Sequence, residues 1–414
     1  MSVGACFAQA IAQHPVSGDR PIGLAVSGGG DSIAMMHLAA RSLAVGQLHV
    51  LSIDHGLRPE AAQELALVNA QAQALGLQHH VGHWSWDGTG NLQAAARAGR
   101  WQALCALAAR HELGMIWMGH TQDDQIETFL MRLARGSGVD GLAAMRMRAT
   151  RGGMPLLRPL LEAKRADLRA WLRQQGISWA DDPSNADARY DRVRARHMAG
   201  ELADLGLTPK RVLQTIDHMN AARATLEQAA HQFAAAHVHE DRGDLLLAPE
   251  VLGDMTTDQH RRVLAAALGW INGRAFRPRF DQLMAAAESL GKGQTATLAG
   301  CILCVDTNNR IRIAREAAAT APRDVLETGL SIIWDSRWRL SGPLRDGLTV
   351  KALGSALIDC PEWRASGIPR SSLLASPAIW DGETLLAAPL AGFANGWSAQ
   401  IVADFHSSAF AIED

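Results

Sequence analysis

Short apolar runs alternate with segments of helical spacing over the first 134 residues of the chain. Runs at 24–26, 48–54 and 115–118, and a weaker one at 78–86, are typical of buried strands. Segments of helical spacing begin at Ser32 and cover 60–75, 91–113 and 122–134. Such regular alternation predicts an α/β fold, a Rossmann-like parallel sheet with helices on both faces.

Two of these helices have distinct faces. In the helix expected over 122–134, the apolar residues Ile126, Phe129, Leu130 and Leu133 form a stripe that predicts burial, and Asp124, Glu127, Thr128, Arg132 and Arg135 lie opposite. In the helix expected over 91–113, small and apolar residues share one face. We expect Arg97, Arg100 and Trp101 on another.

The rest of the chain changes character twice. Helical patterns over 162–175, 208–235, 257–270 and 279–290 precede a predicted hairpin of 295–305 with 310–314, and short strands with glycine and proline turns follow from 322. We therefore expect a catalytic domain over 1–205, a helical domain ending in a hairpin over 206–320, and a small, mostly β domain over 321–414. A length of 414 residues fits two or three domains.

Charge is balanced overall but not locally. The net charge of −2 does not indicate a nucleic-acid partner. The segment 132–211, however, holds sixteen basic residues against nine acidic ones. This excess predicts either a basic surface or a solvated, arginine-rich helical face. No run is long enough to cross a membrane and the N-terminus lacks the pattern of a secretory signal, so a cytoplasmic location is expected.

The five cysteines do not form a recognisable framework. Their odd number and scattered positions fit a reducing compartment. Cys301 and Cys304 form an isolated CxxC pair on an expected strand, where residues three apart point to opposite faces. A structural zinc site needs four ligands, so metal or redox use of this pair is not expected.

A glycine turn joins the first strand to its helix. The residues Ser27-Gly28-Gly29-Gly30-Asp31-Ser32 leave room for an anion to approach the backbone, near the free N–H groups at the start of the helix. An ordinary glycine turn is the alternative. Asp54 and the segment 119–124 also follow expected strands, so the same edge of a parallel sheet would carry all three groups. Asp123 and Asp124 either complement the helix dipole or help to hold a divalent metal.

The segment 27–32 resembles the SGGxDS pyrophosphate loop of enzymes that adenylate a substrate and release pyrophosphate. It lacks the lysine of the kinase-type P-loop. Further motifs, in order and spacing, resemble the tRNA(Ile)-lysidine synthetase family of the PP-loop ATP pyrophosphatase superfamily over about 20–200. They are Asp54-His55-Gly56-Leu57-Arg58, Asn91-Leu92-Gln93 with Ala96-Arg97, Gly119-His120-Thr121 with Asp123-Asp124-Gln125 and Glu127-Thr128, Arg135-Gly136-Ser137-Gly138 with Gly141-Leu142, Arg158-Pro159-Leu160-Leu161, and Asp182-Pro183-Ser184-Asn185.

This resemblance implies a ligase that uses ATP and Mg²⁺. Its substrates would be free L-lysine and the isoleucine tRNA with a CAU anticodon, and lysine would be joined to C2 of the wobble cytidine through an adenylated intermediate. The implied ATP-binding residues are Ser27, Gly28, Gly29, Gly30, Asp31, Ser32, Asp54 and His120.

The resemblance also implies roles for acidic and basic side chains. Asp31 and Asp124 would be catalytic and near the metal, and Asp124 could be a metal ligand or the base for the lysine amine. Arg192 or Arg196 would stabilise charge in the intermediate, and Val193 stands where the family often has asparagine. Arg97, Arg100, Arg132 and Arg135 would contact substrate. The C-terminal domain matches poorly and is expected to contact tRNA, and both a monomer and a homodimer remain open.

Three other functions compete with this one. A 2-thiolating tRNA enzyme would need reactive cysteines near the strand ends, where Cys6 and Cys105 are not expected. A small-molecule amide ligase would leave the arginine-rich segment without a purpose. A purely RNA-binding protein would not explain Asp123 and Asp124 beside a phosphate backbone.

Overall fold

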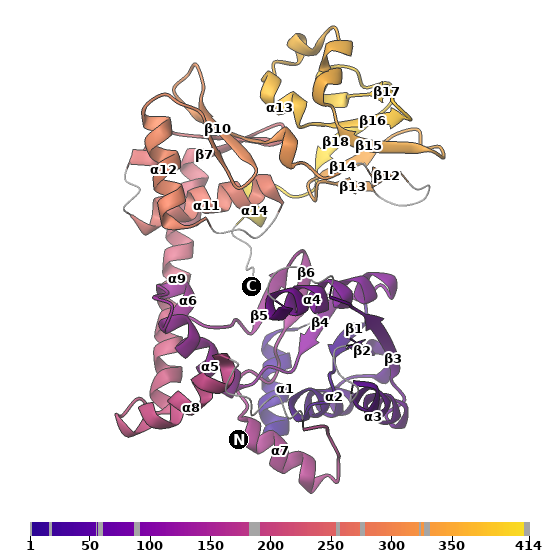
Figure 1. Ribbon diagram of the computed structural model, residues 1–414, viewed down its shortest axis with the longest axis vertical. Helices are drawn as coiled ribbons and strands as arrows, with labels where there is room; N and C mark the ends of the chain where they lie inside the picture. The colour runs from indigo at the N-terminus through magenta and orange to yellow at the C-terminus, as the bar shows by residue number, and fades with distance from the viewer. Residues whose placement is uncertain are drawn as a thin grey trace. The chain divides into compact units, whose positions relative to one another are not determined.

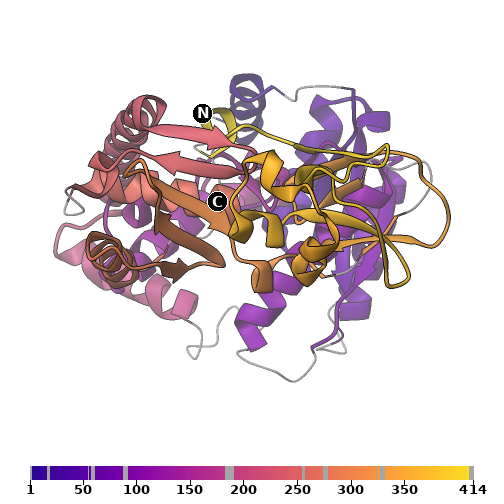
Figure 2. The same ribbon diagram turned by 90° about the horizontal axis from the view of Figure 1, so that it is seen from above.

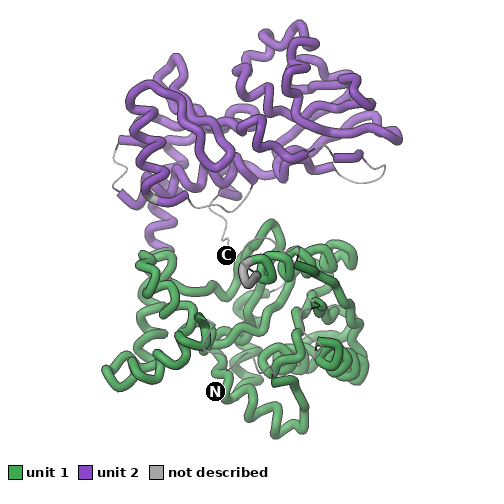
Figure 3. The backbone as a smooth tube through the Cα atoms, in the orientation of Figure 1, with its two compact units in different colours: residues 1–223, 412–414 green, residues 224–411 purple. Residues whose placement is uncertain are grey.

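The computed structural model describes residues 2–15, 19–54, 56, 61–86, 92–181, 191–253, 257–273, 278–322, 324–326 and 332–409. It divides into two compact units, residues 1–223 and 224–411 (Figure 3). The Asp182-Pro183-Ser184-Asn185 turn lies outside the described residues. The domain boundaries expected at 205/206 and 320/321 remain a prediction.

The first unit is built on a six-stranded sheet in the order β3-β2-β1-β4-β6-β5 (Figure 1). All of its pairs are parallel except β5–β6, so the predicted α/β fold with a mostly parallel sheet is confirmed. Its strands are β1 (Ile22–Ala25), β2 (Leu48–Asp54), β3 (Gln78–His83), β4 (Met115–Met118), β5 (Arg148–Arg151) and β6 (Met154–Leu157). Its helices are α1 (Val3–Gln13), α2 (Gly30–Ser42), α3 (Ala61–Ala74), α4 (Leu92–Arg110), α5 (Gln122–Leu133), α6 (Val139–Leu142), α7 (Arg165–Gln174) and α8 (Asp191–Asp204).

Separate apolar cores involve the helices around this sheet. One joins Phe7 of α1 and Met35 of α2 to Trp117 of β4. Another packs Trp101 of α4 with Leu51 and neighbouring strand residues. Trp101 is therefore buried, whereas Arg97 and Arg100, which were predicted on the same helix face, are exposed. Its large apolar ring packs in the same core as Leu104 and Leu107 of α4.

Helix α5 also departs from its predicted faces at three positions, Asp124, Glu127 and Leu133, and Asp124 is only 7% exposed. Ile126, Phe129 and Leu130 are buried as expected, in a core with α8 and α9 (Pro209–His237). Leu133, the last residue of α5, is instead 47% exposed. Glu127, expected on the polar face, is only 4% exposed because arginines surround its carboxylate.

The second unit contains antiparallel sheets in the orders β7-β8-β11-β10-β9, β12-β15-β16-β17 and β13-β14-β18 (Figures 1 and 2). The predicted 295–314 hairpin is present as β9 to β11, whereas the β7–β8 hairpin was not predicted. The strands are β7 (Val238–Asp241), β8 (Asp244–Leu247), β9 (Ala296–Leu298), β10 (Cys301–Val305), β11 (Ile311–Arg315), β12 (Asp324–Val325), β13 (Ile332–Trp334), β14 (Trp338–Ser341), β15 (Leu348–Ala352), β16 (Pro377–Asp381), β17 (Thr384–Ala387) and β18 (Ser398–Ile401). Besides the end of α9, its helices are α10 (Glu250–Gly253), α11 (Asp258–Asn272), α12 (Phe280–Gly291), α13 (Arg370–Leu374) and α14 (Phe405–Ser408).

Buried ion pairs and hydrogen bonds connect the sheets of this second unit. Arg315 of β11 contacts Asp335, which follows β13, at 2.8 Å. Ser372 of α13 donates a hydrogen bond to Asp244 of β8, 2.5 Å away. Cys301 of the CxxC pair is buried on β10, and burial raises the pKa of its thiol to about 12, which keeps it protonated. No described helix combines the length and apolar character needed to span a membrane.

Candidate active site

The glycine turn forms a tight, internally bonded loop. Ser32 Oγ donates to the carbonyl of Gly29 (2.9 Å) and accepts from the N–H of Ser27 (3.2 Å). Gly28 has φ of +90°, a conformation that side chains disfavour. Helix α2 begins at Gly30, two residues earlier than expected, because Gly29 already has the extended conformation of a helix cap. Asp31 therefore lies in the first turn of α2, where backbone N–H groups have no partner inside the helix.

The end of β4 lies directly against this loop. A Cβ placed on Gly119 would lie 3.1 Å from backbone atoms of Asp31 and Ser32, so a side chain here would push this backbone by a few tenths of an ångström. Thr121 caps α5 and is fully buried. Its N–H and O–H both donate to Asp124 Oδ2 at 2.8 Å. The short loop after β4 thus fixes the Asp124 carboxylate beside the glycine turn.

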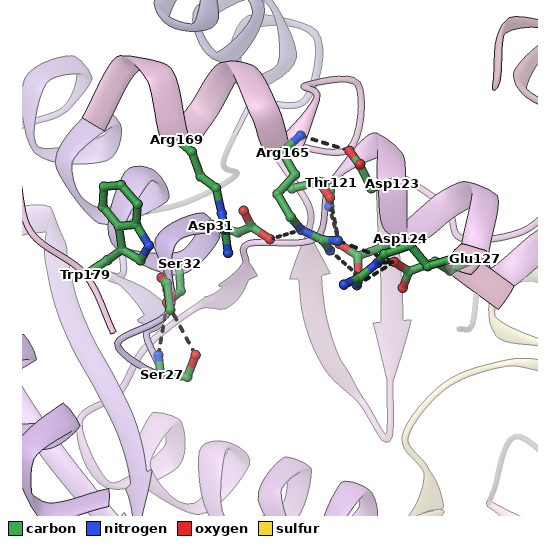
Figure 4. Close-up of polar contacts among 12 residues, drawn as sticks. Ser27, Asp31, Ser32, Thr121, Asp123, Asp124, Glu127, Arg165, Arg169 and Trp179 are labelled. Atoms are coloured by element: carbon green, nitrogen blue, oxygen red, sulfur yellow. Dashed lines mark hydrogen bonds and ion pairs between the residues drawn. The ribbon is translucent and has the colours of Figure 1, made fainter. Parts of the chain in front are cut away.

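Arg165 lies between the acidic residues of both loops (Figure 4). Its Nε is 2.8 Å from Asp31 Oδ2, its Nη2 is 3.1 Å from Asp124 Oδ1, and its Nη1 is 3.3 Å from Glu127 Oε1. Its backbone N–H donates to Asp123 Oδ2 at 2.8 Å, at the start of α7. One guanidinium therefore joins carboxylates from the α2 and α5 helices, and the sequence analysis did not single it out.

Glu127 also contacts a second arginine, Arg196. Arg196 of α8 donates to Glu127 Oε1 through Nη2 at 2.7 Å and through Nε at 3.0 Å. Glu127 and Asp124 are three residues apart, so they lie on one face of α5. That spacing was the available signal for Glu127. For Arg165 the sequence offered no signal beyond its charge, because its contact with Asp31 depends on α7 packing against α2.

The carboxylates of Asp31 and Asp124 differ in their proton affinity. Burial raises the pKa of Asp31 above its usual value although Arg165 opposes the shift. For Asp124, burial also acts to raise the pKa, but Arg165, His120 and the two Thr121 hydrogen bonds outweigh it, so the pKa is lowered. The contrast follows from the donors: Asp124 is fully bonded, whereas Asp31 Oδ1 is buried without a hydrogen-bond partner.

His120 is held as a neutral imidazole. Burial lowers its pKa to about 4, against the opposing effect of Asp124. Its Nδ1 accepts a hydrogen bond from Nε of the buried Arg158 at 3.2 Å, which leaves the proton on Nε2. The positive charges of Arg97 and Arg192 also contribute to lowering this pKa, so both arginines lie within electrostatic range of His120.

The remaining predicted residues are more dispersed. Asp54 ends β2, and its Oδ1 accepts from the N–H of Gly56 at 2.9 Å. Arg100 is an exposed residue of α4. Arg132 donates to the carbonyl oxygens of Gly141 (3.1 Å) and Ala144 (3.0 Å). Arg135 pairs with Asp191 at 3.2 Å on the surface.

The chemistry of the site suits a phosphate ligand and a hard cation. The loop and the start of α2 offer backbone N–H groups to an anion. Asp31 and Asp124 offer two carboxylates close together, which matches the usual protein contribution to a Mg²⁺–phosphate site. The partnerless Asp31 Oδ1 is an oxygen that such a cation would satisfy. The described ranges hold no group of three His, Cys, Asp or Glu residues arranged to bind a metal ion, so the protein would supply two carboxylates here and the phosphates the remaining oxygens.

Comparisons with known proteins identify the family. The PP-loop domain family matches residues 4–202. The tRNA(Ile)-lysidine synthase of Ruegeria pomeroyi is 43% identical over 404 residues, covering 96% of both chains, and that of Hyphomonas neptunium is 36% identical over 68% of this chain and 78% of its own. A solved structure, the U34-tRNA thiolase NcsA from Methanococcus maripaludis with its [4Fe-4S] cluster, aligns with 53% of this chain and 78% of its own at 12% identity. Its TM-score of 0.45 is too low to bear on the fold or function of this chain. The relatives, matched along most of the chain, show that it belongs to the tRNA(Ile)-lysidine synthase family.

Proposed function

We propose that this protein joins L-lysine to C2 of the wobble cytidine in the isoleucine tRNA with a CAU anticodon, at the expense of ATP. The observation that carries the proposal is the glycine loop with Asp31 and Asp124 at one sheet edge, in a chain 43% identical to a named tRNA(Ile)-lysidine synthase. The missing P-loop lysine favours release of pyrophosphate over transfer of the terminal phosphate.

In the first step the C2 oxygen of the cytidine attacks the α-phosphorus of ATP. The new P–O bond forms as the bond to the β-phosphate breaks, and pyrophosphate leaves. The segment 27–32 binds the phosphates through its backbone N–H groups, and His120, uncharged at neutral pH, lies by the nucleotide. Asp31 and Asp124 would hold Mg²⁺, which would neutralise charge on the phosphates.

In the second step an amine of lysine attacks C2, and AMP leaves with the former C2 oxygen. The amine must attack unprotonated, so a group at the site must accept a proton. Asp124, with its lowered pKa, is a weak base unless its contacts to Arg165 are released. The two roles of Asp124, metal ligand and base, therefore both remain in the proposal.

Arginines on α4 and α8 provide positive charge around the reacting base. Arg97 and Arg192 lie within electrostatic range of His120, and Arg196 is held by Glu127. Cations placed where phosphate charge develops stabilise the transition state. We assign Arg192 and Arg196 to this role, and Arg97, Arg100, Arg132 and Arg135 to substrate contact.

The decisive experiment is incorporation of labelled lysine into a transcript of the CAU isoleucine tRNA, with ATP and Mg²⁺. A transcript with uridine at the wobble position is the matched control. We expect label in the first transcript only, with one AMP and one pyrophosphate formed for each lysine. Failure of the folded protein to label the first transcript would refute the proposal.

A further inference from the structure

Arg165 occupies the centre of the acidic site rather than its edge. Its side chain is 18% exposed, and its three guanidinium nitrogens contact Asp31, Asp124 and Glu127 at 2.8, 3.1 and 3.3 Å. The surrounding carboxylates raise its pKa above the usual value although burial opposes this. Arg165 is therefore charged, and it covers oxygens of both carboxylates assigned to the metal.

This contact balances charge in the protein without ligands. Three buried or partly buried carboxylates repel one another unless cations lie between them. Arg196 contacts Glu127, and Arg165 bridges Asp31 and Asp124. Its hold on Asp123 through the backbone fixes the start of α7. The long side chain can therefore reorient while its backbone stays in place.

The same contact conflicts with a bound cation. A magnesium ion needs short, well-directed bonds to its carboxylate oxygens, and a guanidinium already on those oxygens competes with it. The magnesium–ATP complex also brings phosphate oxygens, which are the preferred partners of the planar guanidinium fork. An exchange of partners would satisfy all of these groups: Asp31 and Asp124 to the metal, Arg165 to a phosphate.

We propose that Arg165 is an ATP-binding residue that stands in for the metal in the free enzyme. It holds Asp31 and Asp124 together without ligand, and it transfers its guanidinium to a phosphate oxygen when magnesium–ATP binds. This inference rests on the proposed function only in taking ATP as the nucleotide. It concerns binding, so it can be tested without tRNA or lysine.

The test is to measure two affinities in one set of variants. Binding of Mn²⁺ alone is followed by electron paramagnetic resonance, and binding of ATP with Mg²⁺ by calorimetry. The variants are Arg165→Gln, Arg165→Lys and the control Arg173→Gln, an exposed arginine two turns later on α7. Circular dichroism checks that each variant is folded.

The exchange predicts opposite changes in the two affinities. Arg165→Gln should bind Mn²⁺ about tenfold more tightly, because a competing cation is gone, and ATP about tenfold more weakly, because a charge-assisted bond is lost. Arg165→Lys keeps the charge but lacks the fork, so ATP should bind about threefold more weakly with Mn²⁺ affinity close to that of wild type. Arg173→Gln should match wild type in both.

A purely structural Arg165 gives a different pattern. Both affinities would then fall together in Arg165→Gln, or neither would change, and either result overturns the proposal. If Arg165→Gln does not fold, wild-type ATP affinity in Arg165→Lys overturns it instead. Should lysine transfer fail while the opposite affinity changes are seen, the proposed function falls and the role of Arg165 stands.

Discussion

Asp124 combines a structural contact at the start of α5 with a charge in the proposed active site, and substitutions can separate the two. Its Oδ2 accepts both hydrogen bonds of Thr121 at the start of α5, and its Oδ1 faces Arg165. Asp124→Ala removes both the acceptor for Thr121 and the negative charge facing Arg165. Asparagine keeps an oxygen that can accept from Thr121 but loses the negative charge that we assign to chemistry. The two variants should therefore differ in stability and agree in activity.

The structure sets the size of each effect. Asp124 is 7% exposed and Thr121 is fully buried, so Asp124→Ala leaves a buried N–H and O–H without an acceptor. Each unsatisfied group costs about 1–3 kcal/mol, and the hydroxyl can rotate, so we expect a loss of about 3 kcal/mol in the free energy of unfolding. Asp124→Asn keeps the acceptor for Thr121 but turns its NH₂ donor toward Arg165, which still has two carboxylates to pair with, so we expect a loss of about 1 kcal/mol.

Thermal unfolding and lysine transfer measured on the same samples check this reasoning. At about 2–4 °C per kcal/mol for a domain of this size, Tm should fall by about 6–12 °C in Asp124→Ala and about 2–4 °C in Asp124→Asn. Neither variant should transfer lysine, whereas Asp217→Asn, an exposed carboxylate on α9, should behave as wild type. A wild-type Tm in Asp124→Ala would refute the capping argument, and wild-type turnover in Asp124→Asn would refute the site assignment.

Three further outcomes are expected. Gly119→Ala should cost about 1–3 kcal/mol of stability and weaken ATP binding, because its Cβ would press on the backbone of Asp31, while Gly46→Ala, which meets nothing within 4 Å, should do neither; equal ATP affinities would contradict this. Burial and neighbouring histidines lower the pKa of His80 to about 4, so the folded protein keeps this side chain neutral, and the free energy of unfolding measured in urea should fall as pH drops from 6.5 toward 4. If the free energy of unfolding of His80→Gln falls with pH as steeply as that of wild type, His80 is not the cause. The affinity for tRNA should fall with salt with a log–log slope of about −3 to −4; a flat response would remove the segment 132–211 from tRNA binding.

The sheet edge could be predicted from sequence because it depends on local patterns. The apolar runs at 48–54 and 115–118 coincide with β2 and β4, and parallel pairing brings their carboxyl ends to the side of β1 where the glycine loop begins. Asp31, Asp54 and the segment 119–124 then follow from chain order alone. No knowledge of side-chain packing was needed for these positions.

The centre of the site could not be predicted in the same way. Asp31 and Arg165 are 134 residues apart, and their contact exists because α7 packs beside α2 in the same core. Helical periodicity placed Glu127 on the polar face of α5, and Glu127 does face charged partners there. It could not reveal that arginines from α7 and α8 cover that face and bury the carboxylate.

The salt prediction shows how the fold alters a conclusion drawn from composition. Counting within 132–211 leaves an excess of about seven positive charges, which alone would give a slope of about −5 to −6. Asp31, Asp124 and Glu127 lie outside that segment, yet they pair with its Arg165 and Arg196. These three carboxylates reduce the excess of positive charge around the segment 132–211 from about seven to about four. A measured slope near −6 would mean that RNA binding breaks these pairs and recruits the arginines of the active site itself.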